Sequence, residues 1–218
     1  MSSVSLVGVT TPKIPGVTSA EELVAYAARV SNPSNQMNSE TSRRLLRYLV
    51  NNKHWSPFEM VSVIMEINTT RDIARQILRH RSFSFQEFSQ RYADASSLGL
   101  EYKEARWQDP KNRQNSIQLD STNANDRETA GEWMTLQSRV ADAAMDAYNW
   151  ALNNNIAKEQ ARAVLPEGMT MSRLYMHGTL RSWIHYVQLR CEEGTQQEHR
   201  EVALQCRGIL MDEFPSIA

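Results

Sequence analysis

Two stretches of the chain alternate their side chains with the two-residue period that is typical of β-strands. In residues 61–68 the alternation runs from Val61 to Asn68, and in residues 169–177 it runs from Met169 to His177. Because successive side chains of a strand point to opposite faces of a sheet, such stretches fit a sheet with one covered face. We therefore predict two β-strands that lie far apart in the sequence.

Other stretches repeat their apolar residues every three to four positions, which is typical of α-helices. Helices are predicted after Ser19, from about Glu40 to Asn51, from Arg71 to about His80, from about Asp126 to Leu152, from Ala157 to Leu165, after Thr179, and finally up to about Glu213. The apolar faces of these helices contain Leu23, Ala27, Val30, Leu45, Leu46, Leu49, Ile73, Ile77, Trp133, Leu136, Val140, Ala144, Tyr148, Trp183, Tyr186 and Val187.

Several helix ends carry recognisable signals. Ser19–Glu22 and Thr195–Glu198 have the spacing of a capping box, in which a hydroxyl and a carboxylate satisfy the first backbone N–H groups. Thr69 or Thr70 can cap the helix that begins at Arg71. Helix ends are predicted at Asn32–Asn35, Pro166 and Gly194.

Residues 93–126 are polar and rich in Asn and Asp, and they include Gly99 and Pro110. We predict a long surface loop here, which serves as a lid or an interface arm. No repeat or linker divides the chain, so residues 1–218 are predicted to form one domain. The predicted fold class is α+β, a helix-rich domain packed on a small, mainly antiparallel sheet.

Composition narrows the possible functions. The net charge is −1 with 22% charged residues, whereas sequence-independent nucleic-acid binding usually needs a basic domain. Two cysteines, Cys191 and Cys206, suggest a reducing interior in place of a disulfide framework. No stretch approaches the roughly 20 apolar residues of a membrane span, and residues 1–16 lack a signal-peptide pattern. We expect a cytoplasmic protein (host cytoplasm if viral) without a membrane or nucleic-acid partner.

Positive charge is concentrated in residues 79–91. Arg79, His80 and Arg81 stand together, and Glu87 and Arg91 follow among serines. Such a cluster of cations is costly unless an anion neutralises it, and arginine suits bidentate phosphate recognition. The segment is therefore interpreted as a phosphate and nucleotide site.

The helix before this segment carries Arg71, Arg75 and Arg79 on one face. A solvated face is the simplest interpretation for Arg71 and Arg75, whereas Arg79 and Arg81 are placed to contact phosphate. The aromatic residues of the segment, Phe83, Phe85 and Phe88, are expected to pack, although stacking on a base is an alternative.

Residues 79–91 match a known signature. Arg79-His80-Arg81, Ser84, Ser89 and Arg91 have the spacing found in flavin-dependent thymidylate synthases. The resemblance extends to residues 54–59, 161–166 and 181–190, and together it covers roughly residues 20–212. By this resemblance, the chain is identified as a member of that family.

The resemblance implies methylation of deoxyuridylate (dUMP) to thymidylate. Methylenetetrahydrofolate would supply the carbon, reduced FAD the hydride, and NADPH the electrons that re-reduce the flavin. The family assembles as a homotetramer with active sites shared between subunits.

The resemblance also implies roles for individual residues. The expected FAD contacts are Ser56, Arg79, His80, Arg81, Glu87, Thr179, Leu180, Arg181 and His185. The expected dUMP contacts are Gln76, Arg79, Glu87, Phe88, Ser89, Gln90, Arg91, Arg162 and Arg190. His54 stands where a contact on the folate side is expected.

Arg190 is the expected catalytic residue. A fixed cation at N3 or O4 of uracil would stabilise the negative charge that makes C5 nucleophilic. The residues alone leave open a surface arginine paired with Glu193. Catalysis by a cysteine nucleophile is disfavoured, because Cys206 is predicted to lie in the core and Cys191 points away from Arg190.

Metal binding is not predicted, because the five histidines show no paired ligand spacing. Two rival functions remain at this stage. One is a non-catalytic nucleotide- or RNA-binding module that uses the basic and aromatic strip Arg79–Arg91. The other is a structural helical protein whose arginine face contacts an acidic partner.

Overall fold

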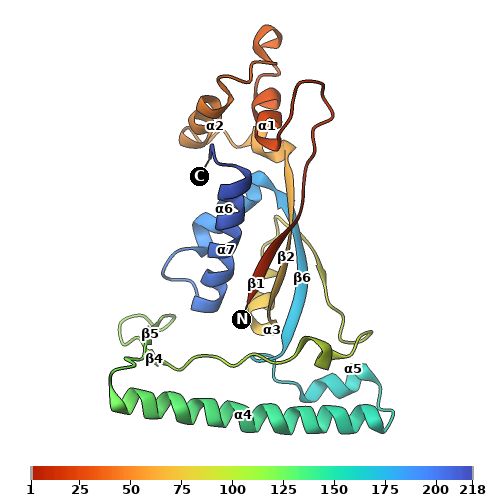
Figure 1. Ribbon diagram of the computed structural model, residues 1–218, viewed down its shortest axis with the longest axis vertical. Coiled ribbons are helices and arrows are strands. Elements are labelled where there is room, and N and C mark those ends of the chain that lie inside the picture. The colour runs from red at the N-terminus through yellow and green to blue at the C-terminus, as the bar shows by residue number, and fades with distance from the viewer. Residues whose placement is uncertain (1, 218) are drawn as a thin grey trace.

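A four-stranded antiparallel sheet forms the centre of the structure, a computed structural model that describes residues 2–217. Its strands, in spatial order, are β1 (Ser3–Val9), β2 (Ser62–Thr70), β6 (Met171–Thr179) and β3 (Ser84–Glu87) (Figure 1). β2 and β6 pair along their whole length, from Ser62 opposite Thr179 to Thr70 opposite Met171. The two strands predicted from alternation are therefore confirmed as the central pair, and the predicted α+β class with an antiparallel sheet is confirmed.

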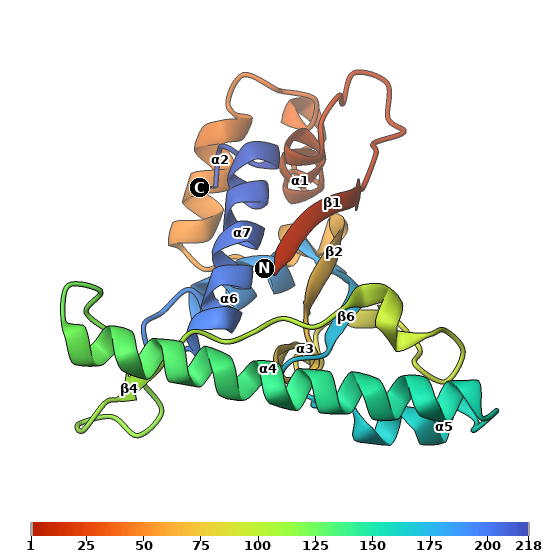
Figure 2. The ribbon, with the colours of Figure 1, turned by 60° about the horizontal axis from the view of Figure 1, so that its bottom comes forward.

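Helices cover one face of this sheet. Along β6, Leu174 and Met176 are buried, whereas Arg173 and Tyr175, which alternate with them, are exposed. The buried face packs against α6 (Leu180–Arg190) and α7 (Gln197–Glu213), which lie side by side (Figures 1 and 2). Trp183 of α6 is fully buried, and its indole N–H donates to the Val63 carbonyl at 3.0 Å. This hydrogen bond ties α6 to the central strand pair.

A smaller helical lobe closes one end of the core. It contains α1 (Ala20–Ala28) and α2 (Ser42–Asn51), together with the 3-10 helices η1 (Pro33–Asn35) and η2 (Ser56–Met60). The C-terminal tail clamps this lobe, because the backbone N–H and the hydroxyl of Ser216 donate to the Glu21 carboxylate at 2.7 and 2.8 Å. Phe214 beside it is fully buried.

A long helix crosses the opposite end of the molecule. α4 (Ala124–Asn153) runs beneath the sheet in Figure 2, and α5 (Lys158–Ala161) and η4 (Arg162–Val164) follow it. The predicted long helix is therefore confirmed. The predicted helix from 157 to 165 is only partly correct, because its second half is a 3-10 turn that ends before Pro166.

The arm, residues 93–126, is mostly irregular as predicted but is not only a loop. It contains η3 (Ala95–Leu98) and the small hairpin of β4 (Arg106–Gln108) and β5 (Ser116–Gln118). Its residue Lys103 is held by the buried Gln137 of α4 through two hydrogen bonds of 2.8 and 2.9 Å. Arg106 forms an ion pair with Glu198 of α7. Both contacts fasten the arm to the rest of the chain.

The apolar face predicted for α4 is only partly correct. Ala144 and Tyr148 are buried as expected, but Trp133, Leu136 and Val140 are 42%, 44% and 52% exposed. The helix meets its own chain through a neighbouring face, and the buried residues of that face are Gln137, Ala141, Ala144, Tyr148 and Ala151. The exposed residues Trp133, Leu136 and Val140 are called the α4 stripe below.

Three helix-end predictions are wrong. α1 ends at Ala28, so Val30 lies beyond it and is 69% exposed. α6 ends at Arg190 instead of Gly194. α7 begins after Gln196 without a side-chain cap, so Thr195–Glu198 is not a capping box. Glu198 instead forms an ion pair with Arg106.

The first capping box is partly confirmed. The Ser19 hydroxyl accepts from the Glu22 N–H at 3.2 Å, as predicted. The Glu22 carboxylate, however, accepts from the backbone and the hydroxyl of Thr18. Thr70 stands at the N-cap of α3 (Arg71–Ile77), but its hydroxyl donates to Asp72 and does not cap the helix.

Phe83 packs where β6 has no side chain. Its ring lies against Gly178, and a Cβ atom at Gly178 would stand 2.4 Å from the Phe83 ring. The same ring makes edge contacts with Trp183 and Tyr186, with centroids 4.9 and 5.9 Å apart. Phe85 also packs against the core, so the packing interpretation of these two aromatic residues is confirmed.

Candidate functional site

Arg190 lies at the end of α6 and is half buried. Its Nε donates a hydrogen bond to His80 Nε2 at 3.0 Å. His80 directly follows the turn that ends α3, so this bond joins two segments that lie far apart in the sequence. Within residues 2–217 this is the only hydrogen bond of the Arg190 side chain, and it leaves both terminal nitrogens available to a ligand. A surface pair with Glu193, the alternative raised from the sequence, does not form.

His80 is neutral in this arrangement. Its Nε2 accepts from Arg190, so the ring proton of the neutral form sits on Nδ1. Burial, followed by the nearby charges of Arg190 and Arg79, lowers the pKa of His80 to about 4. A neutral His80 therefore holds the Arg190 guanidinium without neutralising its charge.

Gln76 of α3 belongs to the same neighbourhood. Its Oε1 is 3.3 Å from Nδ1 of His199, and the other ring nitrogen of His199 is 3.1 Å from the Tyr186 hydroxyl. The His80 and Tyr186 rings meet edge to face at 5.0 Å. Gln76, His80 and Arg190, which the sequence assigns to one site, are thus brought together within one chain.

Arg79 and Arg81 flank His80 and are exposed. The side chains of both lack a hydrogen bond or ion pair to any residue in the described part of the chain. Two unpaired guanidinium groups so close to Arg190 produce a strongly positive surface, which suits an anionic ligand. The expectation that Arg71 forms a solvated face is wrong, because Arg71 is 13% exposed and pairs with Glu87 and Glu167.

Glu87 begins a second group of predicted site residues. It ends β3, accepts from the Ser172 hydroxyl at 2.9 Å and lies 3.8 Å from Arg71. The chain then continues through Phe88, the exposed Ser89 and the buried Gln90. Arg91 and Arg162 both meet Glu159, the first through its carboxylate at 3.4 Å and the second through its carbonyl at 3.4 Å.

A third group surrounds the beginning of α6. The Thr179 hydroxyl caps the helix by accepting from the Ser182 N–H at 3.3 Å, and the Leu180 N–H donates to Val61. Arg181 forms an ion pair with Glu59 of η2, whose first residue is the exposed Ser56. His185 meets Trp55 edge to face at 4.7 Å. Burial, and then Arg181, lower the pKa of His185.

One chain does not bring these groups into a single cleft. Glu87 pairs with Leu174 of β6, whereas the third group is at Thr179 on the same strand. Five residues of strand separate those two positions, about 17 Å at ~3.3 Å per residue. The second and third groups of predicted site residues therefore lie apart on the chain.

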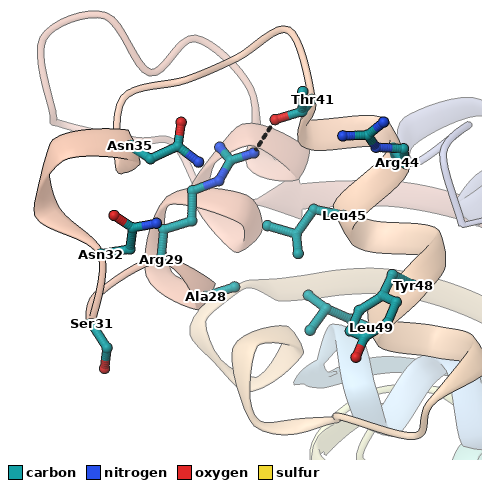
Figure 3. A pocket seen from close by; sticks show the side chains of 10 residues that line it. All are labelled: Ala28, Arg29, Ser31, Asn32, Asn35, Thr41, Arg44, Leu45, Tyr48 and Leu49. Atoms are coloured by element: carbon teal, nitrogen blue, oxygen red, sulfur yellow. Dashed lines mark hydrogen bonds between the residues drawn. The ribbon is translucent and has the colours of Figure 1, made fainter.

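Two cavities lie in the helical lobe. One of about 540 Å³ is bordered by Ser56, Pro57 and Met60 of η2 and by α1. The other, of about 520 Å³, lies between α1 and α2, where Arg29 reaches between Asn35 and Thr41 (Figure 3). Tyr48 lines this second cavity, and its ring meets His54 at 6.0 Å. Volumes of this size are typical of small-molecule sites.

The cysteines do not provide an activated nucleophile. Cys206 is fully buried, and burial raises its pKa well above the ordinary thiol value. Burial also raises the pKa of Cys191. A thiolate is the reactive form, so both positions disfavour covalent catalysis. Residues 2–217 contain no cluster of His, Cys, Asp and Glu that could hold a metal ion, and none of their helices is long and apolar enough to cross a membrane.

Sequence reasoning missed four residues of this site. His199, Tyr186, Gln196 and Glu198 form a polar network behind Gln76. Tyr186 had been assigned only to an apolar helix face, and Glu198 to a capping box. A buried histidine on the apolar face of a terminal helix was the one available signal, since such a residue needs polar partners.

Comparison with known proteins agrees with this geometry. Residues 14–216 match the family described as thymidylate synthase complementing protein. The chain is 50% identical over 216 residues to a probable flavin-dependent thymidylate synthase of Paramecium bursaria Chlorella virus 1, covering 99% of this chain and 97% of the relative. It is also 50% identical over 201 residues to the flavin-dependent thymidylate synthase of Synechocystis, covering 92% and 88%.

A solved structure shows the same fold. The UMP/dUMP methylase PolB of Streptomyces cacaoi, crystallised with 5-Br dUMP, superposes with a TM-score of 0.78 and 26% sequence identity. The match covers all of this chain and 93% of that one. The family match covers most of the chain, and the resemblance inferred from its motifs is confirmed: the chain belongs to the thymidylate synthase complementing protein family, together with flavin-dependent thymidylate synthases.

Proposed function

We propose that this chain is a flavin-dependent thymidylate synthase, which methylates dUMP to thymidylate. The observation that carries the proposal is the Arg190–His80 pair, in which a neutral histidine orients a half-buried guanidinium whose terminal nitrogens are unused. The family membership and the relatives named above support the same activity.

Arg190 is the proposed catalytic residue. Uracil C5 becomes nucleophilic when negative charge builds on the ring, and a fixed cation at the ring edge stabilises that charge. Arginine does not give up its proton near neutral pH, so its contribution is electrostatic. His80 adds orientation, because its Nε2 fixes one guanidinium edge and directs the other toward the nucleotide. The remaining proposed dUMP contacts are Gln76, Arg79, Glu87, Phe88, Ser89, Gln90, Arg91 and Arg162.

The residues around α6 fit a bound flavin. FAD combines a pyrophosphate with flat apolar rings, and it supplies the hydride when it is bound in its reduced form. Arg79 and Arg81 offer unpaired cations for the pyrophosphate. Ser56 borders an apolar cavity, and the preceding residue, Trp55, contacts His185. The residues proposed to hold FAD are Ser56, Arg79, His80, Arg81, Glu87, Thr179, Leu180, Arg181 and His185.

Two co-substrates complete the proposed reaction. Methylenetetrahydrofolate supplies the one-carbon unit, and NADPH re-reduces the flavin. His54 is the proposed contact on the folate side, because it is exposed and its ring meets Tyr48 at the edge of the cavity between α1 and α2.

Complete active sites are proposed to form between subunits of a homotetramer. The second and third groups of site residues lie apart on one chain, so in this proposal another chain brings matching groups together. The α4 stripe supports such assembly, since three large apolar side chains of one helix are 42% to 52% exposed. A single domain spanning residues 1–218 is the proposed repeating unit.

The non-catalytic RNA-binding alternative finds no support in the site. Base stacking would need exposed aromatic side chains along Arg79–Arg91, yet Phe83 and Phe85 pack against the core.

The proposal is tested by the absorbance spectrum of the purified protein and by Arg190→Ala. The wild type should carry oxidised flavin that is bleached by NADPH without oxygen, and it should convert dUMP with methylenetetrahydrofolate. Arg190→Ala should lower turnover by at least about a hundredfold, the size expected when one preorganised charge is lost, while flavin binding is largely kept.

Arg207→Ala is the matched control, because Arg207 is an exposed arginine on α7 outside the site. It should keep wild-type turnover. A colourless wild-type protein that neither takes up FAD nor forms thymidylate would refute the proposed function. Wild-type turnover by Arg190→Ala would refute the role of Arg190 alone.

A further inference from the structure

Behind Gln76 runs a chain of hydrogen bonds that the proposed chemistry does not use. It links Tyr186 to His199 at 3.1 Å, His199 to Gln76 at 3.3 Å, and Gln76 to Gln196 at 2.7 Å. Gln196 then contacts Glu198 at 3.0 Å, and Arg106 from the arm pairs with the same carboxylate. His199 and Tyr186 are 0% and 2% exposed, so these polar groups cannot exchange partners with water.

The donor and the acceptor of every hydrogen bond in this series follow from the ionised carboxylate of Glu198 at its end. Burial alone would raise the pKa of Glu198, but hydrogen bonds from its own backbone, Arg106 and Gln196 outweigh it and lower the pKa. A carboxylate only accepts, so Gln196 donates to it with Nε2 and accepts with Oε1. Gln76 must then donate its Nε2 hydrogen to Gln196, which leaves Gln76 Oε1 facing His199.

The same reasoning determines which ring nitrogen of His199 carries the proton. Oε1 of Gln76 can only accept, so His199 donates from Nδ1. Neutral His199 then carries a lone pair on Nε2, which accepts from the Tyr186 hydroxyl. Burial, followed by the charges of Arg190 and His80, keeps His199 neutral. The series therefore runs one way, from Tyr186 through His199, Gln76 and Gln196 to Glu198.

This order determines what Gln76 can offer to a ligand. Its amide oxygen is engaged by His199 and one amide hydrogen by Gln196, so one N–H remains. An amide that was free to rotate could turn either its oxygen or its NH2 group toward a ligand, whereas these two bonds fix where the remaining N–H of Gln76 points. A donor pairs with a carbonyl oxygen and is repelled by an amino group.

We propose that Tyr186 and His199 are positioning residues that, together with Gln196, lock Gln76 as a hydrogen-bond donor and so make the site select a uracil ring over a cytosine ring. Uracil has a carbonyl oxygen at C4, where cytosine has an amino group. The inference rests on the proposed function, because it takes Gln76 as a contact of dUMP.

The experiment measures the dissociation constants of dUMP and dCMP for the flavin-loaded protein. Wild type should prefer dUMP. His199→Leu removes the donor that holds Gln76 Oε1 and leaves only the bond to Gln196, so the amide turns over more easily and can accept from an amino group. The preference for dUMP over dCMP should then narrow by roughly two- to tenfold, the worth of one misdirected hydrogen bond.

Rescue by a conservative variant separates positioning from packing. His199→Asn places an amide N–H near the former Nδ1 and should restore most of the preference. Val202→Ala, one turn further along α7 and fully buried, is the matched core control. It should lower the unfolding temperature while leaving the ratio of the two dissociation constants unchanged.

Tyr186→Phe is the second test variant, to be used if His199→Leu fails to fold, because it removes only a single hydroxyl. It should narrow the preference less than His199→Leu, because His199 can still donate from Nδ1. If His199→Leu and Tyr186→Phe both fold and both keep the wild-type ratio of the dUMP and dCMP dissociation constants, the inference is overturned. The same holds if only Tyr186→Phe folds and it keeps that ratio. A wild type that binds both nucleotides equally would overturn it too, whereas a wild type that binds neither would refute the proposed function.

Discussion

At the scale of single residues, His80 and His199 lie near Arg190 as uncharged side chains, so they neither repel nor neutralise its guanidinium. His80 is half buried and His199 fully buried close to Arg190, and their pKa values are lowered to about 4 and about 3. A protonated imidazole at either position would repel the guanidinium that the site needs. Neutral histidines can accept or donate hydrogen bonds in its place, so they orient Arg190 and Gln76 without competing for the anionic substrate.

The depressed pKa values predict how stability depends on pH. Between about pH 3 and the ordinary histidine pKa of 6.5, the unfolded chain binds protons that the folded chain excludes. The stability that depends on neutral His80 and His199 is therefore complete above pH 6.5 and is lost progressively as the pH falls through 4 toward 3. Urea unfolding at several pH values measures this slope.

His199→Asn should make the slope shallower, because it removes one of the two groups. His177→Gln is the control, since His177 is exposed on the open face of the sheet. Equal slopes for His199→Asn and wild type would contradict the assignment.

Residues with local signatures could be predicted from the sequence. Arg79, His80, Arg81 and Arg190 belong to recognisable motifs, and the structure places His80 against Arg190. The Tyr186–His199 contact could not be predicted in this way, because it depends on how α6 and α7 pack. The assigned FAD and dUMP roles of the remaining residues stay predictions.

At the scale of elements, the junction of β6 and α6 depends on close packing at one glycine. Gly178 lets the Phe83 ring lie directly on the β6 backbone. Phe83 follows Arg81 almost immediately, so the position of this ring sets the position of the cationic segment. A small residue in a strand thus positions side chains in a neighbouring loop.

Gly178→Ala should push the Phe83 ring away, because the added Cβ would stand 2.4 Å from it. We expect a loss of about 1–3 kcal/mol in the free energy of unfolding, and weaker binding of dUMP as Arg79 and Arg81 shift. Urea unfolding and nucleotide titration measure the two effects.

Gly208→Ala is the matched control, because no atom lies within 4 Å of its added Cβ and alanine favours a helix. It should be neutral or stabilising. Combining Gly178→Ala with Phe83→Leu should recover part of the loss. If Gly178→Ala is as stable as wild type, the packing argument is wrong.

Strand prediction succeeded in the centre of the sheet and failed at its edges. β2 and β6 alternate clearly because one of their faces is buried along the whole strand. β1 and β3 are edge strands, and most of their side chains are exposed or only half buried. Without a buried face there is little alternation to detect, so both were missed.

At the scale of the whole molecule, α4 presents large apolar side chains that its own chain does not cover. A sequence pattern shows that a helix has an apolar side, but it does not show whether the partner is the same chain or another. In α4, Gln137 and Ala141 are buried by the rest of the chain, whereas Leu136 and Val140 are not. The remaining stripe is the proposed subunit contact.

Leu136→Asp with Val140→Asp should therefore split the proposed tetramer. In an isolated protomer both side chains face solvent, so the changes should leave its fold intact. Across a subunit interface they would bury unpaired charge, which costs several kcal/mol. Sedimentation velocity measures the change in mass.

Arg139→Glu, an exposed position on the same helix, should keep the wild-type mass. Thymidylate formation should fall together with the tetramer, because the second and third groups of site residues lie apart on one chain. A double variant that sediments like wild type would exclude the stripe as a contact.

The clamp between Ser216 and Glu21 has a consequence for the protein during its synthesis. The helical lobe is translated early, yet Ser216, which fastens it, follows Glu21 by 195 residues. The central strand β2 likewise waits for β6, whose codons follow much later. A nascent polypeptide on the ribosome therefore keeps apolar surface uncovered until β6 and Ser216 have been synthesised, and chaperones have that whole interval in which to bind it.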